Sequence, residues 1–186
     1  QIVALTTSQA SVMSAAQFSN MTTNQIAVME TADLAAVAST SIAALTTEQA
    51  AALTTTQVQN ISTKQISAIG TSAFAALSTD QIVALTTGQA AVLSTAQVSA
   101  MTTNQIAALE TQDFAVISQA GIAALSTDQI VKLDTQQLVA LTTSQAAALT
   151  STQIASLLTS QIASLETTDL AQVSSTAISG LTTEQA

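Results

Sequence analysis

Three segments of the chain carry a pair of carboxylates at one spacing, in the form Glu-Thr-x-Asp. The pairs are Glu30 and Asp33, Glu110 and Asp113, and Glu166 and Asp169. One interpretation is a calcium cluster, because Ca²⁺ takes about six to eight oxygen ligands and the neighbouring threonines add hydroxyls. The other is helix capping, with the Thr at the cap and the Asp in the first turn, where negative charge is favourable. We favour capping and expect neither a metal nor a cofactor, since two carboxylates without an Asx-rich loop are a weak metal signal.

Serine and threonine hydroxyls are the other reactive groups, and they lack a partner for catalysis. A hydroxyl nucleophile needs a general base. The chain has no histidine or cysteine, and its only basic residues, Lys64 and Lys132, stand in unrelated segments. We therefore expect that the protein is not an enzyme.

Composition excludes further classes of function. The net charge is −9 with two basic residues, so the chain lacks the basic stripe that binds nucleic acid. No apolar run approaches the roughly 18 residues of a membrane span, so we expect no membrane insertion. Apolar residues at 48% argue against disorder.

An octapeptide repeat of the form Gln-Φ-a-a-Φ-Thr-Thr-x, where Φ is apolar and "a" is usually small, runs through residues 1–186. Every eighth residue from Ile2 to Ala186 is apolar, and a second apolar series starts at Leu5, three residues later. Self-similarity at a fixed period indicates a repeat architecture. The chain begins and ends within an octad, so we interpret it as part of a longer array.

The spacing of the apolar positions favours helix over strand. Residues at i and i+3 share one helix face, whereas a strand would alternate. The corners supply start signals, because Ser78-Thr79-Asp80-Gln81 and similar segments match the S/T-x-x-Q capping box. Most corners offer two hydroxyl residues, so either could be the cap.

A continuous helix does not fit an eight-residue period. Eight residues at about 100° each would turn the apolar stripe by roughly 80° per octad and expose it to water. A helix broken at every corner keeps the stripe inside, but such stubs are unstable alone. They must stack, which predicts an all-α solenoid of short capped helical stubs, one per octad. A β-solenoid with Thr-rich turns is the alternative, since Thr favours strands.

A longer period lies over the octads. Octads whose leading apolar residue is only Ala start at Thr6, Thr46, Thr86, Thr142 and Thr182. Successive starts are five octads apart, except for one interval of seven octads between Thr86 and Thr142. These five-octad super-repeats have two interpretations. They arose by duplication of a 40-residue block, or they mark one face of the array that a partner contacts.

The string Ala-Leu-Thr-Thr-x-Gln, at Ala4, Ala44, Ala84 and Ala140, resembles the ALTTxQ-type repeats of large proteobacterial cell-surface, adhesin-like proteins. The resemblance covers the whole chain. It implies an exported protein, extracellular or on the bacterial cell surface, in which the repeats form a stalk or fibre.

Together these features predict a structural protein that forms a stalk, a sheath or a self-assembling filament. Few charges mean little repulsion against self-association. The alternative is an adhesin-type binding module with an acidic, calcium-stiffened face. An ice-binding Thr ladder is a minor alternative.

Overall fold

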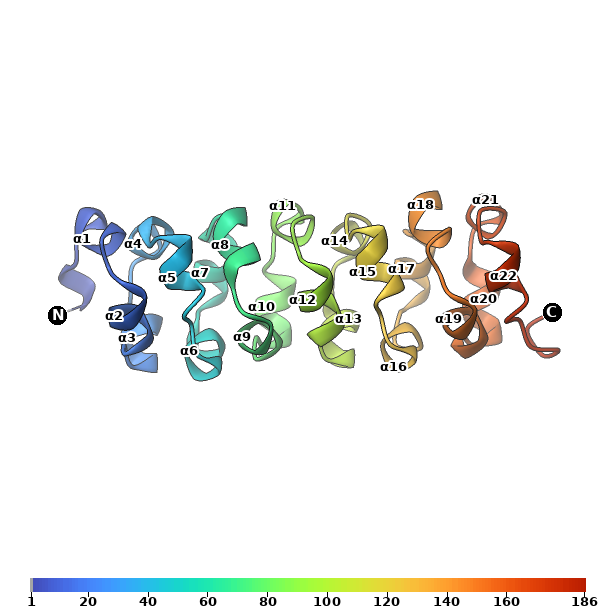
Figure 1. Cartoon of the computed structure of the whole chain (residues 1–186), viewed down its shortest axis with the longest axis horizontal. Helices are drawn as coiled ribbons and strands as arrows, with labels where there is room; N and C mark the ends of the chain where they lie inside the picture. The colour runs from blue at the N-terminus through green and yellow to red at the C-terminus, as the bar shows by residue number, and fades with distance from the viewer. Residues whose placement is uncertain (1) are drawn as a thin grey trace. The chain divides into compact units, whose positions relative to one another are not determined.

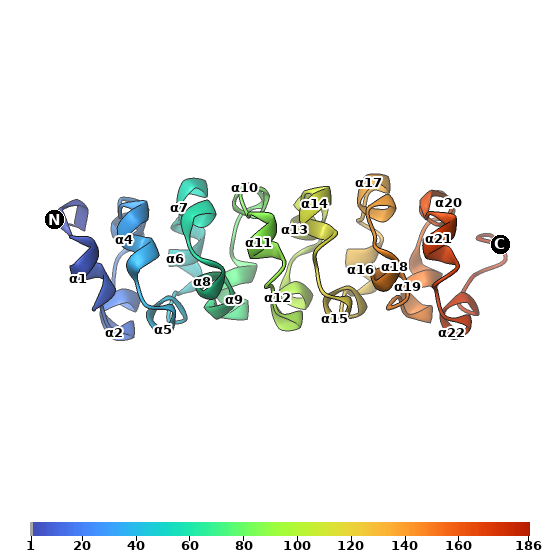
Figure 2. The same cartoon turned by 90° about the horizontal axis from the view of Figure 1, so that it is seen from above.

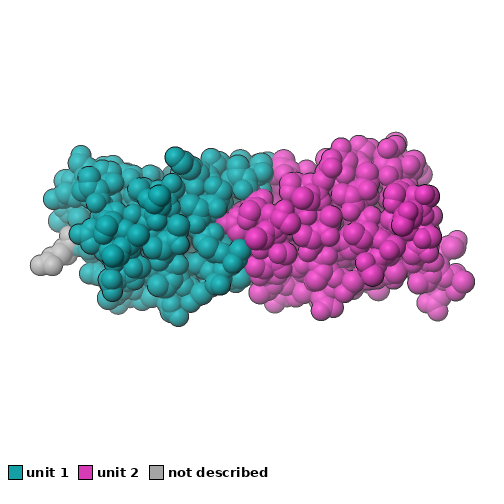
Figure 3. Space-filling view, in the orientation of Figure 1, with its two compact units in different colours: residues 1–92 teal, residues 93–186 magenta. Residues whose placement is uncertain are grey.

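A computed structural model describes residues 2–186. The chain divides into two compact units, unit 1 from Gln1–Val92 and unit 2 from Leu93–Ala186 (Figure 3). Within residues 2–186 all regular structure is helical, and none of these helices is long and apolar enough to cross a membrane.

Each octad forms one short helix, as the period predicts. Unit 1 contains a 3₁₀ turn η1 (Ile2–Ala4) and helices α1 (Thr7–Ser11), α2 (Ala15–Ser19), α3 (Thr23–Ala27), α4 (Thr31–Ala36), α5 (Ser39–Ile42), α6 (Thr47–Ala52), α7 (Thr55–Asn60), α8 (Thr63–Ala68), α9 (Thr71–Ala75), α10 (Thr79–Val83) and α11 (Thr87–Ala90). Unit 2 contains α12 (Thr95–Ala100), α13 (Thr103–Ala108), α14 (Thr111–Phe114), α15 (Gln119–Ala123), α16 (Thr127–Ile130), α17 (Thr135–Val139), α18 (Thr143–Ala146), α19 (Ser151–Ser156), α20 (Thr159–Ser164), α21 (Thr167–Leu170) and α22 (Ser175–Ile178).

The first residue of each corner is the N-cap, and the second is the first residue of the helix. In the standard octads both halves of the capping box are present, as in Thr54 with Gln57 and Ser78 with Gln81. The side-chain oxygen of the cap accepts from the amide three residues on, and the Gln carbonyl accepts from the backbone N–H of the cap. The capping prediction is confirmed for these octads. Of the two hydroxyl residues at each corner, the first is the N-cap.

The helices of each unit wind into a superhelix (Figures 1 and 2). Each helix contacts the helix three octads later, as in α1 with α4 and α3 with α6 in unit 1, and α12 with α15 and α19 with α22 in unit 2. A helix that has turns on both sides of it within its unit therefore packs on a neighbour from each, as α4 does with α1 and α7. This is the all-α solenoid that the octad predicts.

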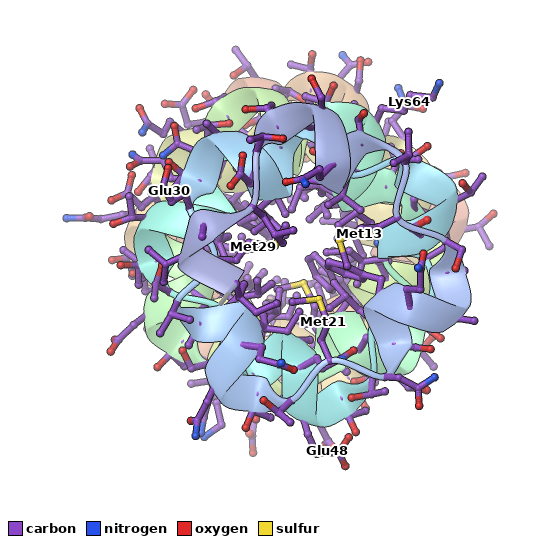
Figure 4. The ribbon with its side chains drawn as sticks, turned by 90° about the vertical axis from the view of Figure 1, so that its left-hand side faces the viewer. Met13, Met21, Met29, Glu30, Glu48 and Lys64 are labelled. Atoms are coloured by element: carbon purple, nitrogen blue, oxygen red, sulfur yellow. The ribbon has the colours of Figure 1, made fainter. Side chains whose placement is uncertain are left out.

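The core lies along the superhelix axis, lined by both apolar series. In unit 1 the Met13, Met21 and Met29 side chains point toward the axis, whereas Glu30, Glu48 and Lys64 project outward (Figure 4). The leading apolar residues are almost completely buried, among them Phe18, Ile26, Phe74, Ile106 and Phe114. Burying one such side chain stabilises a fold by about 1.5–3 kcal/mol. Two per octad explain why helices of four to six residues persist.

Candidate functional site

The residue with the most interactions in each octad is the glutamine at the third helical position. Gln57 in α7 is an example, and its first set of hydrogen bonds lies within its own octad. Its Oε1 accepts from the Thr54 backbone N–H at 2.8 Å, and its own backbone N–H donates to Thr54 Oγ1 at 3.1 Å. This pair closes the capping box and fixes the orientation of the side-chain amide.

The same amide also reaches an earlier turn of the superhelix. Gln57 Nε2 donates to the backbone carbonyls of Ile26 and Met29, both at 2.8 Å. The Ile26 carbonyl, at the end of α3, also accepts from the Met29 backbone N–H at 3.2 Å. The Met29 carbonyl lies just after the helix, and among the described residues no backbone amide donates to it. We call the two bonds from Nε2 the glutamine bridge. It is buried, because only 2% of Gln57 is exposed.

The glutamine bridge recurs through both units. Gln49, Gln57, Gln65, Gln81 and Gln89 make it in unit 1, and Gln129, Gln137, Gln145, Gln153, Gln161 and Gln185 in unit 2. Each donates to the carbonyl 28 residues earlier and, in most octads, to the carbonyl 31 residues earlier. One side chain thus satisfies a helix start and an earlier helix end.

The bridge and the helix contacts together define the superhelix within each unit. Helices touch at a separation of three octads, and the bridge reaches the end of the helix four octads back. One turn therefore takes between three and four octads. Five octads make more than one turn and less than two, so successive five-octad repeats within a unit face different directions.

Only glutamine supplies this set of contacts. Oε1 must accept, Nε2 must donate twice, and the side chain must reach an earlier turn. The capping box alone would tolerate Glu as well as Gln, yet no octad has Glu at this position. The bridge was missed from the sequence, and this absence of Glu is the signal that could have revealed it.

The acidic pairs occupy the two positions that form the capping box in the standard octads, namely the N-cap and the third helical residue. Glu30, Glu110 and Glu166 are the N-caps of α4, α14 and α21, and none makes a side-chain capping bond. The expectation that Thr31, Thr111 or Thr167 is the cap is wrong. These threonines begin their helices, because the frame set by the neighbouring octads places the cap one residue earlier.

The aspartates stand where the other octads have glutamine, and they are buried. Asp33, Asp113 and Asp169 lie in the first turns of their helices, as the capping interpretation predicts, and are at most 3% exposed. Asp33 Oδ2 has no hydrogen-bond partner. Across residues 2–186 no three acidic, histidine or cysteine side chains gather into a group that could hold a metal.

Two carboxylates have pKa values shifted in opposite directions. Burial raises the pKa of Asp169, and the charge of Glu166 adds to the rise. The exposed Glu48 accepts hydrogen bonds from its own backbone N–H and from the Thr46 and Thr47 hydroxyls, which lower its pKa. Asp169 and Glu48 therefore change the stability of the fold in opposite directions as the pH falls.

We expect Asp169→Asn to remove a pH dependence from stability. The folded state raises the pKa of Asp169, so its contribution is full below the ordinary value of 3.8 and is lost as the pH rises through the folded value. Urea unfolding midpoints of the two proteins should differ most at neutral pH, with the variant more stable, and converge in acid. Glu48→Gln is the control with the opposite sign, because a lowered pKa stabilises above the unfolded value. A constant difference between Asp169→Asn and the parent across this range would contradict the assignment.

Glu110 lines one surface hollow of unit 2, together with Thr111 and Gln112. Two other hollows of this unit carry little chemistry. One lies against Gln119, Thr143, Ser144 and Gln172, and another against Thr135, Gln136 and Val139. Their linings are amides, hydroxyls and methyl groups. These groups can hydrogen bond to a ligand but provide no general base.

A family of known repeat proteins matches the octapeptide repeat of this chain. The sequence model of the ALTTAQ repeat matches residues 26–63, 58–87, 83–111 and 106–143, which together span more than half of the chain. This agrees with the resemblance drawn from the Ala-Leu-Thr-Thr-x-Gln strings. No curated protein matches the chain.

Proposed function

We propose that this chain, which belongs to the ALTTAQ repeat family, is a structural element of a bacterial surface stalk, sheath or self-assembling fibre. The glutamine bridge is the observation that carries the proposal. It ties each standard octad to the end of the helix four octads back, through the same atoms each time. An array joined in this way lengthens by adding octads, without a new kind of contact.

The surface supports association between copies. Charged residues are only 7% of the chain, so electrostatic repulsion between neighbouring arrays is weak. Thr, Ser and Ala dominate the outward-facing positions, and these short side chains lose little conformational entropy on packing. Lateral contact between arrays therefore meets little opposition from charge or entropy.

Two features of the geometry count against the adhesin-type alternative. In the form that relies on the five-octad super-repeats, it needs those repeats on one side of the array. Within a unit, successive five-octad repeats face different directions, because five octads make more than one turn and less than two. The acidic pairs are also incomplete as a metal site within residues 2–186.

The test is negative-stain electron microscopy of the purified protein across a concentration series. We expect regular filaments that become more numerous as concentration rises. Separate rods of constant length at every concentration would contradict self-assembly, and the protein would then be a monomeric stalk. Irregular particles, together with loss of helical circular dichroism, would contradict both forms.

A matched variant links the filaments to the bridge. Gln57→Glu should remove or shorten the filaments, because it breaks a bridge inside unit 1. Gln59→Glu adds the same charge on the exposed face of the same helix and should leave them intact. Equal loss in both variants would mean that surface charge governs assembly.

A further inference from the structure

Two consecutive octads near the end of unit 2 lack the glutamine of the bridge. Asp169 stands in its place in α21, and Ala177 in α22. Neither side chain can donate as the glutamine amide does, because an ionised carboxylate only accepts hydrogen bonds and Ala has no polar group. The octads on either side keep their bridges, through Gln161 and Gln185.

The missing bridges leave carbonyls of the earlier turn without a donor. The register of the neighbouring bridges assigns the Leu141 carbonyl to Asp169 and the Leu149 carbonyl to Ala177, each 28 residues earlier. Among the described residues no donor reaches either carbonyl. Both leucines are 4% exposed. A buried acceptor without a donor weakens the folded state locally.

Unit 1 contains a partial version of the same pair. Asp33 also replaces the glutamine, and its Oδ2 is buried without a partner. The next octad has Ser41, whose Oγ donates to the Met13 carbonyl, 28 residues earlier, at 2.8 Å. Ser41 thus keeps one of the two bonds of a bridge, whereas Ala177 keeps neither.

We propose that the pair of octads led by Asp169 and Ala177 is a weak joint, at which the superhelix of unit 2 opens before the bridged octads do. Because a turn takes between three and four octads, two adjacent octads without a bridge remove half to two thirds of the bridges that join one turn to the preceding turn. The remaining contact there is apolar packing between α18 and α21 and between α19 and α22. The joint follows from the packing within unit 2 and holds whether or not the protein forms fibres.

Hydrogen exchange of the whole chain, followed by mass spectrometry or NMR, tests the joint. Local opening free energies appear as exchange rates of individual segments. We expect amides in α21 and α22 to exchange faster than those in α19 and α20. Asp169→Gln combined with Ala177→Gln should slow exchange in α21 and α22 about tenfold, the size expected from restored hydrogen bonds.

A reciprocal variant separates the joint from fraying near the end of the chain. Gln145→Asp combined with Gln153→Ala moves the same pair to α18 and α19. Exchange should become about tenfold faster there, while α12 and α13 stay unchanged. If the two glutamines at 169 and 177 leave exchange in α21 and α22 unaltered, fraying explains their mobility and the joint is refuted.

A calcium titration gives a second way to overturn the proposal. Asp169 and the unpaired carbonyls are all oxygen acceptors, and a bound cation could bridge them. Calcium should leave exchange in α21 unchanged. If calcium slows it in the parent but not in Asp169→Gln, the position is a cation site rather than a joint.

Discussion

Gln57→Glu should lower the free energy of unfolding by about 3–5 kcal/mol, the usual cost of a buried charge without a partner. The new carboxylate would face the Ile26 and Met29 carbonyls, which now accept from Gln57 Nε2 at 2.8 Å. The carboxylate oxygen that replaces Nε2 would then meet two carbonyl oxygens in a buried site, with no hydrogen to share between them. Urea unfolding followed by circular dichroism measures the loss.

The control is Gln59→Glu in the same helix, where the side chain is exposed. It should change stability by less than about 0.5 kcal/mol. Part of the loss in Gln57→Glu should return on acidification, because a protonated carboxyl can donate one hydrogen bond. Equal stability of the two variants at neutral pH would refute the energetic role of the bridge.

Leu85→Asp should be similarly damaging, with a loss of about 4 kcal/mol or more. Leu85 closes the octad of α10 and is 4% exposed. The substitution removes apolar packing and buries an unpaired charge. Thermal unfolding should begin at a lower temperature, and hydrogen exchange should locate the damage in α10 and its packing neighbour α7.

Val83→Asp is the matched control for Leu85→Asp. Val83 ends α10 and is 44% exposed, so its replacement should leave the melting temperature nearly unchanged. The comparison isolates the inward face of the octad. A Leu85→Asp protein with full helix content and unchanged melting temperature would contradict the proposed core.

Much of the fold could be predicted because it is local. Apolar residues at i and i+3 define the inward face, and Phe18, Ile26 and Leu85 are buried there as expected. The S/T-x-x-Q corners define the helix starts, as at Ser78 and Gln81. These features depend on contacts within one octad, and that is the range over which an octad pattern carries information.

The number of octads per turn and the second role of glutamine could not be predicted, because both depend on contacts between successive turns of the superhelix. The capping box already explains Gln57, so nothing local requires a further partner. The error at Glu30 arises from the opposite cause. Residue preference favours Thr31 as the cap, but the packing of the superhelix fixes the frame of every octad and outweighs that preference.

The glutamine bridge also determines how the gene for such an array can change. Because the bridges reach 28 residues back and, in most octads, 31 residues back, recombination that removes or adds whole octads gives every later glutamine an equivalent partner. Loss of a single codon misaligns only the bridges that span it, and alignment is regained within about one turn. The interval between Thr86 and Thr142 is seven octads where five are usual, and it fits an insertion of two octads that preserved this register. Length is therefore a trait that can vary in the lineage in steps of one octad.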